Sequence, residues 1–147
     1  MSLALEDERY RVIWLVRRLF RALAQRSNEI TAGFGLSSAD RAVMEFLYPD
    51  KALSVPELAK LYQVARQHVQ VTANGLLERH LLEAARNPRH KRSPLLSLSP
   101  AGKETFEAIL TRDAEAIGVL FDGVAETRLR TTRQTLQALL HALSDPG

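Results

Sequence analysis

Apolar residues recur at three- and four-residue spacing along much of the chain, which is the pattern of amphipathic helices. The first such segment covers residues 10–28. Its apolar stripe consists of Val12, Ile13, Val16, Leu19, Phe20, Leu23 and Ser27, and the arginines largely outside it are Arg11, Arg17, Arg18, Arg21 and Arg26. Gly33 and Gly35 then interrupt the pattern, so the sequence predicts one long helix before them.

Capping signals predict where two further helices begin. Ser37 lies three residues before Asp40, a spacing typical of a capping box, and Pro49-Asp50 stops the stripe that follows. Ser54 stands in the same relation to Glu57 and opens a third helix. Both serines are therefore expected at helix N-termini.

The helix after Ser54 is short, and we expect Leu58, Ala59 and Leu61 to face inward. Only residues 62–65 separate it from another predicted helix at roughly 66–79. The buried stripe of that helix would consist of Val69, Thr72, Ala73, Leu76 and Leu77. Two short helices joined by so tight a turn indicate a helix-turn-helix.

A β-hairpin is predicted directly after this motif. Residues 82–86 and 94–98 each favour a short strand, and the polar, basic segment 87–93 connects them. Such a hairpin after a helix-turn-helix is a wing. Ser99-Pro100 then opens a helix to about Leu120, and a last helix is expected at about 125–143. The predicted class is mainly α (α+β), with a winged helix-turn-helix.

Composition narrows the function classes. The 147 residues suit one domain, and 46% apolar with 25% charged residues is ordinary for a globular protein. No apolar stretch approaches the ~20 residues that span a bilayer, and the first residues are acidic rather than signal-like. We therefore expect a cytoplasmic protein with no membrane partner. The absence of cysteine excludes disulfides, thiolate metal sites and thiol redox switches in this chain.

The distribution of charge is more informative than the small basic excess of 20 over 17. No acidic residue occurs between Glu83 and Glu104, a window that contains Arg86, Arg89, Lys91, Arg92 and Lys103. A local basic stretch is an electrostatic signature of phosphate binding. The alternative interpretation is a solvated loop that only keeps the protein soluble.

An ordered set of residues between Leu53 and Glu104 resembles a known family. The set consists of Leu58-Ala59, Val64, Val69, Leu76, Arg92 and Leu98-Ser99-Pro100-Ala101-Gly102. In order and spacing it is similar to the multiple antibiotic resistance regulator (MarR) family, and the flanking helices match in kind. The resemblance implies a winged helix-turn-helix on a helical homodimer that binds double-stranded DNA.

Four positions depart from the family pattern. Gln63 and His80 stand where glycine is usual, and a left-handed backbone is unfavourable for a residue with a Cβ. Ala65 replaces the usual serine N-cap of the second motif helix, and such a loss lowers the stability by ~1 kcal/mol. His90 stands where the wing usually has an aspartate, which removes an Asp–Arg contact.

The outer face of the second motif helix is the expected base-reading surface. An α-helix fits the major groove, where glutamine and asparagine pair with adenine and valine touches a thymine methyl. No acidic residue occurs from Lys60 to Leu77, so the face is unusual for a merely solvated helix. Its members are Arg66, Gln67, His68, Gln70, Val71 and Asn74.

The wing residues Arg89, Lys91 and Arg92 are expected along the DNA backbone or in the minor groove, with Arg92 also matching the family position. The helix N-termini at Ser37 and Ser54 are weaker phosphate-binding candidates, because capping alone explains both serines.

The resemblance implies one MarR-like domain over residues 1–147. Residues of about 37–98 would form the DNA-binding lobe, and residues of about 5–30 and 100–144 would form the dimerisation helices. A two-fold dimer places its two recognition helices about one DNA turn, ~34 Å, apart on a pseudo-palindromic site. The alternative is that the apolar stripes of these helices pack only within their own chain.

The resemblance also implies that a small effector, often an aromatic anion, releases the DNA. Candidate pocket residues are Trp14, Arg17, Phe34, Met44 and Tyr48, and ordinary packing explains them equally well. We expect no cofactor and no metal, because His68, His80, His90 and His141 lack tight ligand spacing. No phosphate-binding glycine loop or nucleophile motif predicts an enzyme.

Two functions remain open from the sequence. The first is a sequence-specific, homodimeric transcriptional regulator, repressor or activator. The second is a winged-helix protein-interaction module that has lost sequence-specific DNA binding, an alternative motivated by Gln63, Ala65, His80 and His90.

Overall fold

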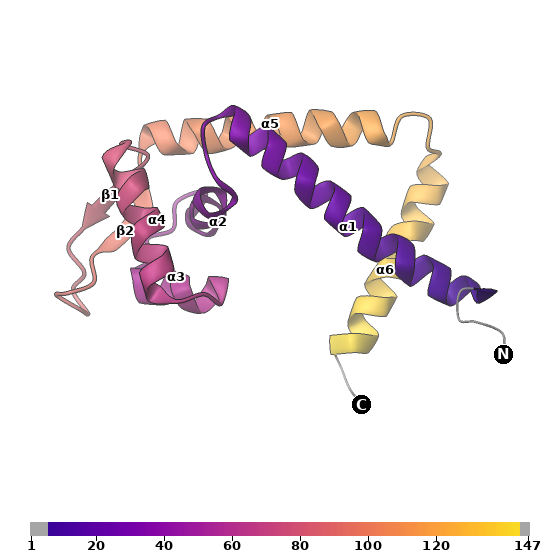
Figure 1. Cartoon of the computed structure of the whole chain (residues 1–147), viewed down its shortest axis with the longest axis horizontal. Coiled ribbons are helices and arrows are strands. Elements are labelled where there is room, and N and C mark those ends of the chain that lie inside the picture. Colours follow the sequence, from indigo (N-terminus) through magenta and orange to yellow (C-terminus); the bar gives the residue numbers. More distant parts are fainter. Residues whose placement is uncertain (1–5, 145–147) are drawn as a thin grey trace. The chain divides into compact units, whose positions relative to one another are not determined.

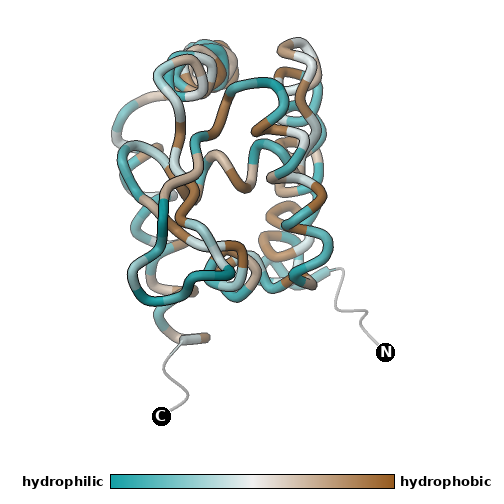
Figure 2. Tube along the Cα trace, turned by 90° about the vertical axis from the view of Figure 1, so that its left-hand side faces the viewer, coloured by the Kyte–Doolittle hydropathy of each residue, from teal (hydrophilic) through white to brown (hydrophobic). Residues whose placement is uncertain are grey.

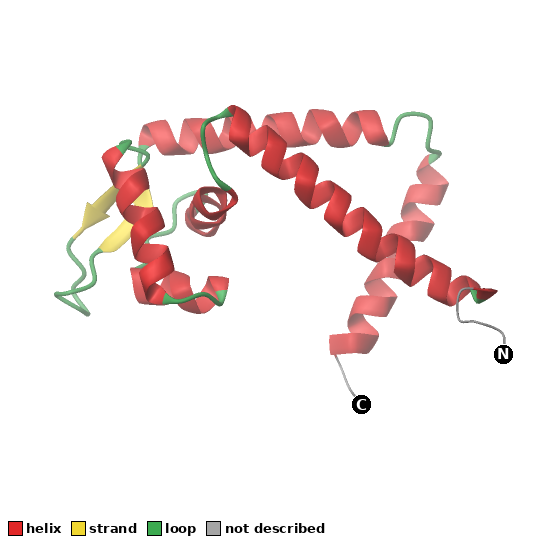
Figure 3. Cartoon of the chain, in the orientation of Figure 1, coloured by secondary structure: helices red, strands yellow, loops and turns green. Residues whose placement is uncertain are grey.

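The computed structural model describes residues 6–144, which form helices and one small hairpin (Figures 1 and 3). The elements in order are α1 (Glu8–Gly33), α2 (Ser38–Leu47), α3 (Val55–Tyr62), α4 (Arg66–Glu78), β1 (Leu82–Ala85), β2 (Leu95–Leu98), α5 (Pro100–Leu120) and α6 (Glu126–Ser144). The predicted mainly helical winged fold is confirmed. Residue 5, where the first expected dimerisation segment begins, and the two ends of the expected 1–147 domain lie outside the described residues.

Ser37 and Ser54 are the N-caps of α2 and α3, as the sequence predicts. At α2 the Ser37 hydroxyl accepts the Asp40 N–H at 3.0 Å, and the Asp40 carboxylate accepts the Ser37 N–H at 2.9 Å, a complete capping box. At α3 the Ser54 hydroxyl accepts the Glu57 N–H at 3.4 Å and donates to the Glu57 carboxylate at 3.0 Å. Each cap satisfies an amide that the helix itself leaves unpaired.

The core lies where α2, α3, α4, the hairpin and the first half of α5 meet. Its fully covered members include Val43, Met44, Leu47, Leu58, Val69, Ala73, Leu76, Leu96, Phe106 and Ile109. The apolar stripe of α4 is therefore buried as predicted at Val69, Thr72, Ala73 and Leu76, whereas Leu77 is only partly buried. Leu61 is the exception on α3, because it is 54% exposed, and the prediction that it faces inward is wrong. Leu58 and Ala59 already cover the short helix's inner side, which leaves Leu61 on the outer one.

The hairpin is antiparallel, with Leu82 opposite Leu98 and Ala85 opposite Leu95. Leu53, in the loop before α3, extends it by one bridge that the sequence did not predict. The Leu53 and Leu96 backbones exchange hydrogen bonds of 2.9 and 2.8 Å. This bridge fastens the start of the helix-turn-helix to the base of the wing.

Gly102 allows the start of α5 to lie against the end of the α4–β1 connection. A Cβ at this position would lie 1.9 Å from the carbonyl oxygen of Leu81. The Ser99 hydroxyl tightens the same junction, since it donates to the His80 carbonyl at 2.6 Å and accepts the Gly102 N–H at 2.9 Å. The junction therefore depends on Ser99 and Gly102, two residues of the segment that also carried the family resemblance.

The chain separates into two compact units, Met1–Asp113 and Ala114–Gly147. At the end of the first unit, Arg41 of α2 forms an ion pair with Asp113 of α5 and also donates to the Thr31 hydroxyl of α1 at 3.3 Å. These contacts hold the C-terminal end of α1, α2 and α5 together within that unit.

The terminal helices keep much of their apolar surface exposed. Along the trace in Figure 2, hydrophobic and hydrophilic residues alternate in bands, as expected for amphipathic helices. On α1 the exposed stripe residues include Val16, Leu19 and Phe20, the last at 72%. Helix α6 has no buried residue among those described. None of the helices within residues 6–144 combines the length and apolar content that crossing a membrane requires.

Candidate nucleic-acid interface

Gln63 and His80, which stand where glycine is usual, both have a positive φ. Gln63 has left-handed backbone angles (φ 59°, ψ 43°), and its N–H caps α3 at the Ala59 carbonyl. His80, after α4, also has φ 59°. A left-handed conformation costs a residue with a Cβ roughly 1–2 kcal/mol, and both residues adopt it in this fold. These two departures therefore do not prevent the helix-turn-helix from forming.

The third departure has the expected local consequence. Ala65 is the N-cap of α4 and makes no side-chain capping hydrogen bond. The first turn of α4 carries no acidic residue either. The start of this helix is thus left with amides that no side chain caps, next to Arg66.

The predicted reading surface lies on the exposed side of α4. Val69, Ala73 and Leu76 face the core at 0% exposure, and the residues of the opposite side are exposed: Arg66, Gln67, His68, Gln70, Val71 and Asn74. Val71 is 62% exposed although it is apolar. The Gln70 side-chain amide donates to the Asn74 side-chain oxygen at 2.9 Å, and this hydrogen bond orients both side chains. We refer to this set of six residues as the α4 face.

The wing cations are exposed and available. Arg89, Lys91 and Arg92 lie in the loop between β1 and β2, which projects beyond the strands (Figure 1). None of the ion pairs found within residues 6–144 includes them. Lys103 differs, because its ammonium lies 3.2 Å from the Asp50 carboxylate. The basic stretch of the sequence therefore splits into a free wing group and a paired lysine.

Asn87 orders the wing loop, a role that the sequence analysis missed. Its side chain is 5% exposed and bonds to both sides of the loop: it accepts the Arg89 N–H at 3.0 Å and donates to the Ser93 carbonyl at 2.9 Å. The sequence did carry a signal, since asparagine before proline is typical of side-chain-stabilised turns.

The two serines proposed near phosphates act as helix caps. Ser37 is exposed, whereas Ser54 is only 3% exposed. Both hydroxyls accept an amide of their own helix, so contact with phosphate at these N-termini stays a prediction.

The structure does not gather the five effector-pocket candidates in one place. Met44 is fully buried in the core, and Phe34 and Tyr48 pack partly buried against that core. Trp14 is exposed and stacks with Arg18, whose guanidinium carbon lies 4.6 Å from the ring centroid, and Arg17 is exposed as well. Trp14 also lines a pocket of about 280 Å³ with Tyr10, Arg11 and Leu15. The effector site stays a prediction.

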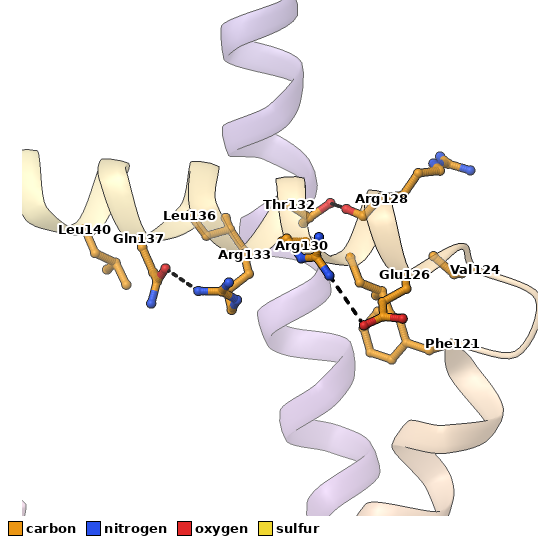
Figure 4. A pocket seen from close by; sticks show the side chains of 11 residues that line it. Phe121, Val124, Glu126, Arg128, Arg130, Thr132, Arg133, Leu136, Gln137 and Leu140 are labelled. Atoms are coloured by element: carbon orange, nitrogen blue, oxygen red, sulfur yellow. Dashed lines mark hydrogen bonds and ion pairs between the residues drawn. The ribbon is translucent and has the colours of Figure 1, made fainter.

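Helix α6 and the turn before it surround a broader hollow of about 700 Å³ in the second unit. Leu136 and Leu140 contribute apolar surface to it (Figure 4). Polar neighbours are bonded to one another, with Arg133 donating to Gln137 at 2.8 Å and Arg130 lying 3.6 Å from Glu126. The surface is therefore mixed, with apolar side chains beside polar ones that interact with each other.

Comparison with known proteins agrees with this geometry. No protein-family model matches the chain. Uncharacterised proteins of Mycobacterium tuberculosis and Mycobacterium bovis are each 36% identical over 121 residues, covering 82% of this chain and 85% of the relative.

Solved structures with the same fold include MarR regulators. A MarR family transcription regulator superposes with a TM-score of 0.84 at 24% identity, covering 95% of this chain and 93% of that one. A MarR family protein from Bacillus stearothermophilus gives 0.83 at 15% identity, with 95% and 98% covered. A mutant of Staphylococcus aureus MepR, bound to an oligodeoxyribonucleotide, gives 0.67 at 17% identity, with 90% and 97% covered.

The fold of the chain is the MarR-type winged helix, which confirms the resemblance found in the sequence. The chain belongs to the same family as the mycobacterial proteins.

Proposed function

We propose that the protein is a sequence-specific, DNA-binding transcriptional regulator. The observation that carries this proposal is the pairing of two surfaces in one lobe: an exposed α4 face without an acidic residue, and a wing whose cations have no ion-pair partner among the described residues. Exposed amides suit base edges, and unpaired cations suit phosphates. A protein of the same fold, the MepR mutant, is bound to an oligodeoxyribonucleotide.

The regulator would act as a homodimer on a pseudo-palindromic site. The exposed stripe of α1 and the uncovered leucines of α6 support this part of the proposal, because exposed apolar patches of this kind mark association surfaces. Leu140 and Leu143, 65% and 81% exposed, lie three residues apart on α6.

A small anion or aromatic molecule would release the DNA. The arginines near Trp14 support this, since the Arg18 guanidinium carbon lies 4.6 Å from the exposed indole ring and Arg17, on the same helix, is exposed. The ring of an aromatic anion would stack on the indole, and its charge would pair with the guanidinium groups.

A fluorescence-anisotropy titration tests DNA binding directly. The full-length protein is titrated against the duplex from upstream of its own gene and against random duplex, at several salt concentrations. We expect saturable, salt-dependent binding that favours the first duplex. Equal, weak binding to both at moderate salt would support the protein-interaction module instead.

Two alanine variants sharpen this titration. Arg92→Ala should weaken binding to every sequence alike and lower the log–log salt slope by about one. Lys103→Ala is the matched control, because this lysine is already paired with Asp50, and its slope should equal that of the unaltered protein. An unchanged slope in Arg92→Ala would remove that residue from the phosphate contacts.

Sedimentation velocity tests the dimer. Leu140→Arg places a charge on the uncovered stripe of α6 and should shift the protein to monomer. Gln134→Arg lies on the other side of the same helix and should leave the dimer intact. A monomeric unaltered protein would contradict the dimer.

A further inference from the structure

The wing carries one buried polar side chain among exposed neighbours. Asn87 is 5% exposed, while Arg86, Pro88 and Arg89 around it are exposed. The burial is matched by hydrogen bonds, because the side-chain oxygen accepts the Arg89 N–H at 3.0 Å and the side-chain nitrogen donates to the Ser93 carbonyl at 2.9 Å. A buried amide satisfied at both ends fixes the backbone on both sides of it.

The chemistry at this position specifically suits a carboxamide. The group must accept on one side and donate on the other, and asparagine does both, whereas an ionised aspartate only accepts. Pro88 and Pro94 lack N–H groups, so they cannot replace the cross-loop hydrogen bonds. The remaining backbone bond in the loop, from the Ser93 N–H to the His90 carbonyl, is 3.3 Å long.

We propose that Asn87 is the positioning residue of the wing: it holds the loop in a fixed shape so that Arg89, Lys91 and Arg92 meet DNA phosphates together. The inference rests on the proposed function and deepens it. His90 cannot supply the Asp–Arg contact that the family resemblance implies at that position. In this chain the Asn87 carboxamide joins the two sides of the loop instead.

The physical consequence is a lower ordering cost on binding. A loop that is free before binding loses conformational entropy when its cations settle on phosphates, and that loss weakens the complex. A loop already closed by two hydrogen bonds has lost this freedom on folding. Asn87 would thus raise affinity without touching DNA.

Limited trypsin digestion of the free, full-length protein tests whether Asn87 keeps the wing loop ordered. Trypsin cleaves after lysine and arginine, and the wing offers Arg86, Arg89, Lys91 and Arg92 as sites. We expect Asn87→Ala to be cut in the wing about tenfold faster, in proportion to the loss of about one net hydrogen bond or slightly more. Ser93→Ala is the matched control, since Ser93 contributes only its backbone N–H and carbonyl to the loop, and its cleavage rate should stay within about twofold of the unaltered protein.

Anisotropy titrations test the consequence for DNA. Asn87→Ala should weaken binding about tenfold and lower the salt slope by about one, while its far-ultraviolet circular dichroism matches that of Ser93→Ala and its Tm is lower by only about 2–6 °C. The same change should alter binding by less than about twofold when Arg89, Lys91 and Arg92 are already alanine, because no cations are left to position.

The outcomes separate this inference from the proposed function. If the unaltered protein binds no duplex selectively, the proposed function falls and this inference with it. If the unaltered protein binds but Asn87→Ala binds equally well, only the role of Asn87 is overturned. An equal loss of affinity with and without the three cations would also overturn it, because Asn87 would then act elsewhere.

Discussion

Helices α4 and α6 carry the same kind of apolar stripe and differ completely in burial. Val69, Ala73 and Leu76 of α4 are fully covered, whereas Leu140 and Leu143 of α6 are 65% and 81% exposed. Both stripes follow helical spacing, so periodicity shows only that a helix has one apolar side. What covers that side depends on the neighbours that the fold supplies, and α4 has α2, α3 and β1 beside it.

The difference in burial between the two stripes corresponds to a difference in the function that each helix suits. The covered stripe of α4 fixes the helix in its lobe and turns the amide-rich side outward, as a recognition surface requires. The uncovered stripe of α6 is suited to association, where apolar area removed from water contributes roughly 25 cal/mol per Å². The comparison therefore predicts that substitutions on the two stripes fail in different ways.

Leucine truncation on each helix should show the largest difference. Leu76→Ala removes a fully buried side chain and should lower the free energy of unfolding by about 2–5 kcal/mol, at any protein concentration. Leu140→Ala should change stability only as far as the dimer contributes, so its effect should vary with protein concentration. Chemical denaturation at two protein concentrations checks both. A concentration-independent loss in Leu140→Ala would show that its own chain covers α6.

Two glycines of α5 provide the next contrast. Gly102→Ala forces a Cβ toward the Leu81 carbonyl and should destabilise the lobe by about 1–3 kcal/mol or more. Gly118 has open space around it and helical geometry, so Gly118→Ala should stabilise the helix by about 0.5–1 kcal/mol. Thermal unfolding measures both the expected loss of stability in Gly102→Ala and the expected gain in Gly118→Ala. Destabilisation by Gly118→Ala would indicate that a second chain packs closely against this part of α5.

Two exposed glutamines compare the helices in DNA binding. Gln67→Ala on the α4 face should relax sequence preference by about 1–3 kcal/mol at the base it contacts, through loss of a bidentate hydrogen bond. Gln134→Ala on α6 should leave affinity and preference unchanged. Titration against a panel of single-base operator variants distinguishes them. If Gln67→Ala weakened every duplex equally, Gln67 would not read bases.

The smallest effect is expected at the start of α4. Ala65→Ser would supply the missing N-cap and should raise the free energy of unfolding by about 1 kcal/mol. Urea denaturation checks this gain, with Ala138→Ser in the middle of α6 as the control that should gain nothing. No gain at Ala65 would mean that the α4 amides are satisfied in another way.

Much of the fold could be predicted because its signals are local. Ser37 and Ser54 marked helix starts three residues ahead of their partners, and Ser99-Pro100 marked the third start. The face of α4 opposite Val69 and Leu76 was also placed correctly, because a helix turns by a fixed angle per residue. Capping and helical periodicity act over three or four residues, which a sequence displays directly.

The errors and omissions concern how folded segments meet, which capping and periodicity do not show. Leu61 was expected inside and lies outside, because Leu58 and Ala59 fill the inner side of α3 against its neighbours. The bridge from Leu53 to Leu96 joins residues far apart in the chain. The hold of Asn87 on Ser93 depends on how the hairpin closes.

The sequence alone determined where the helices begin, which side of each is apolar, and that a basic, acid-free stretch follows the helix-turn-helix. The folded arrangement shows in addition that α4's stripe is covered and α6's is not, that residue 102 must be a glycine, and that Asn87 orders the wing. The reason is physical: capping and periodicity are properties of neighbouring residues, whereas burial and close approach depend on which distant segments the folded chain brings together.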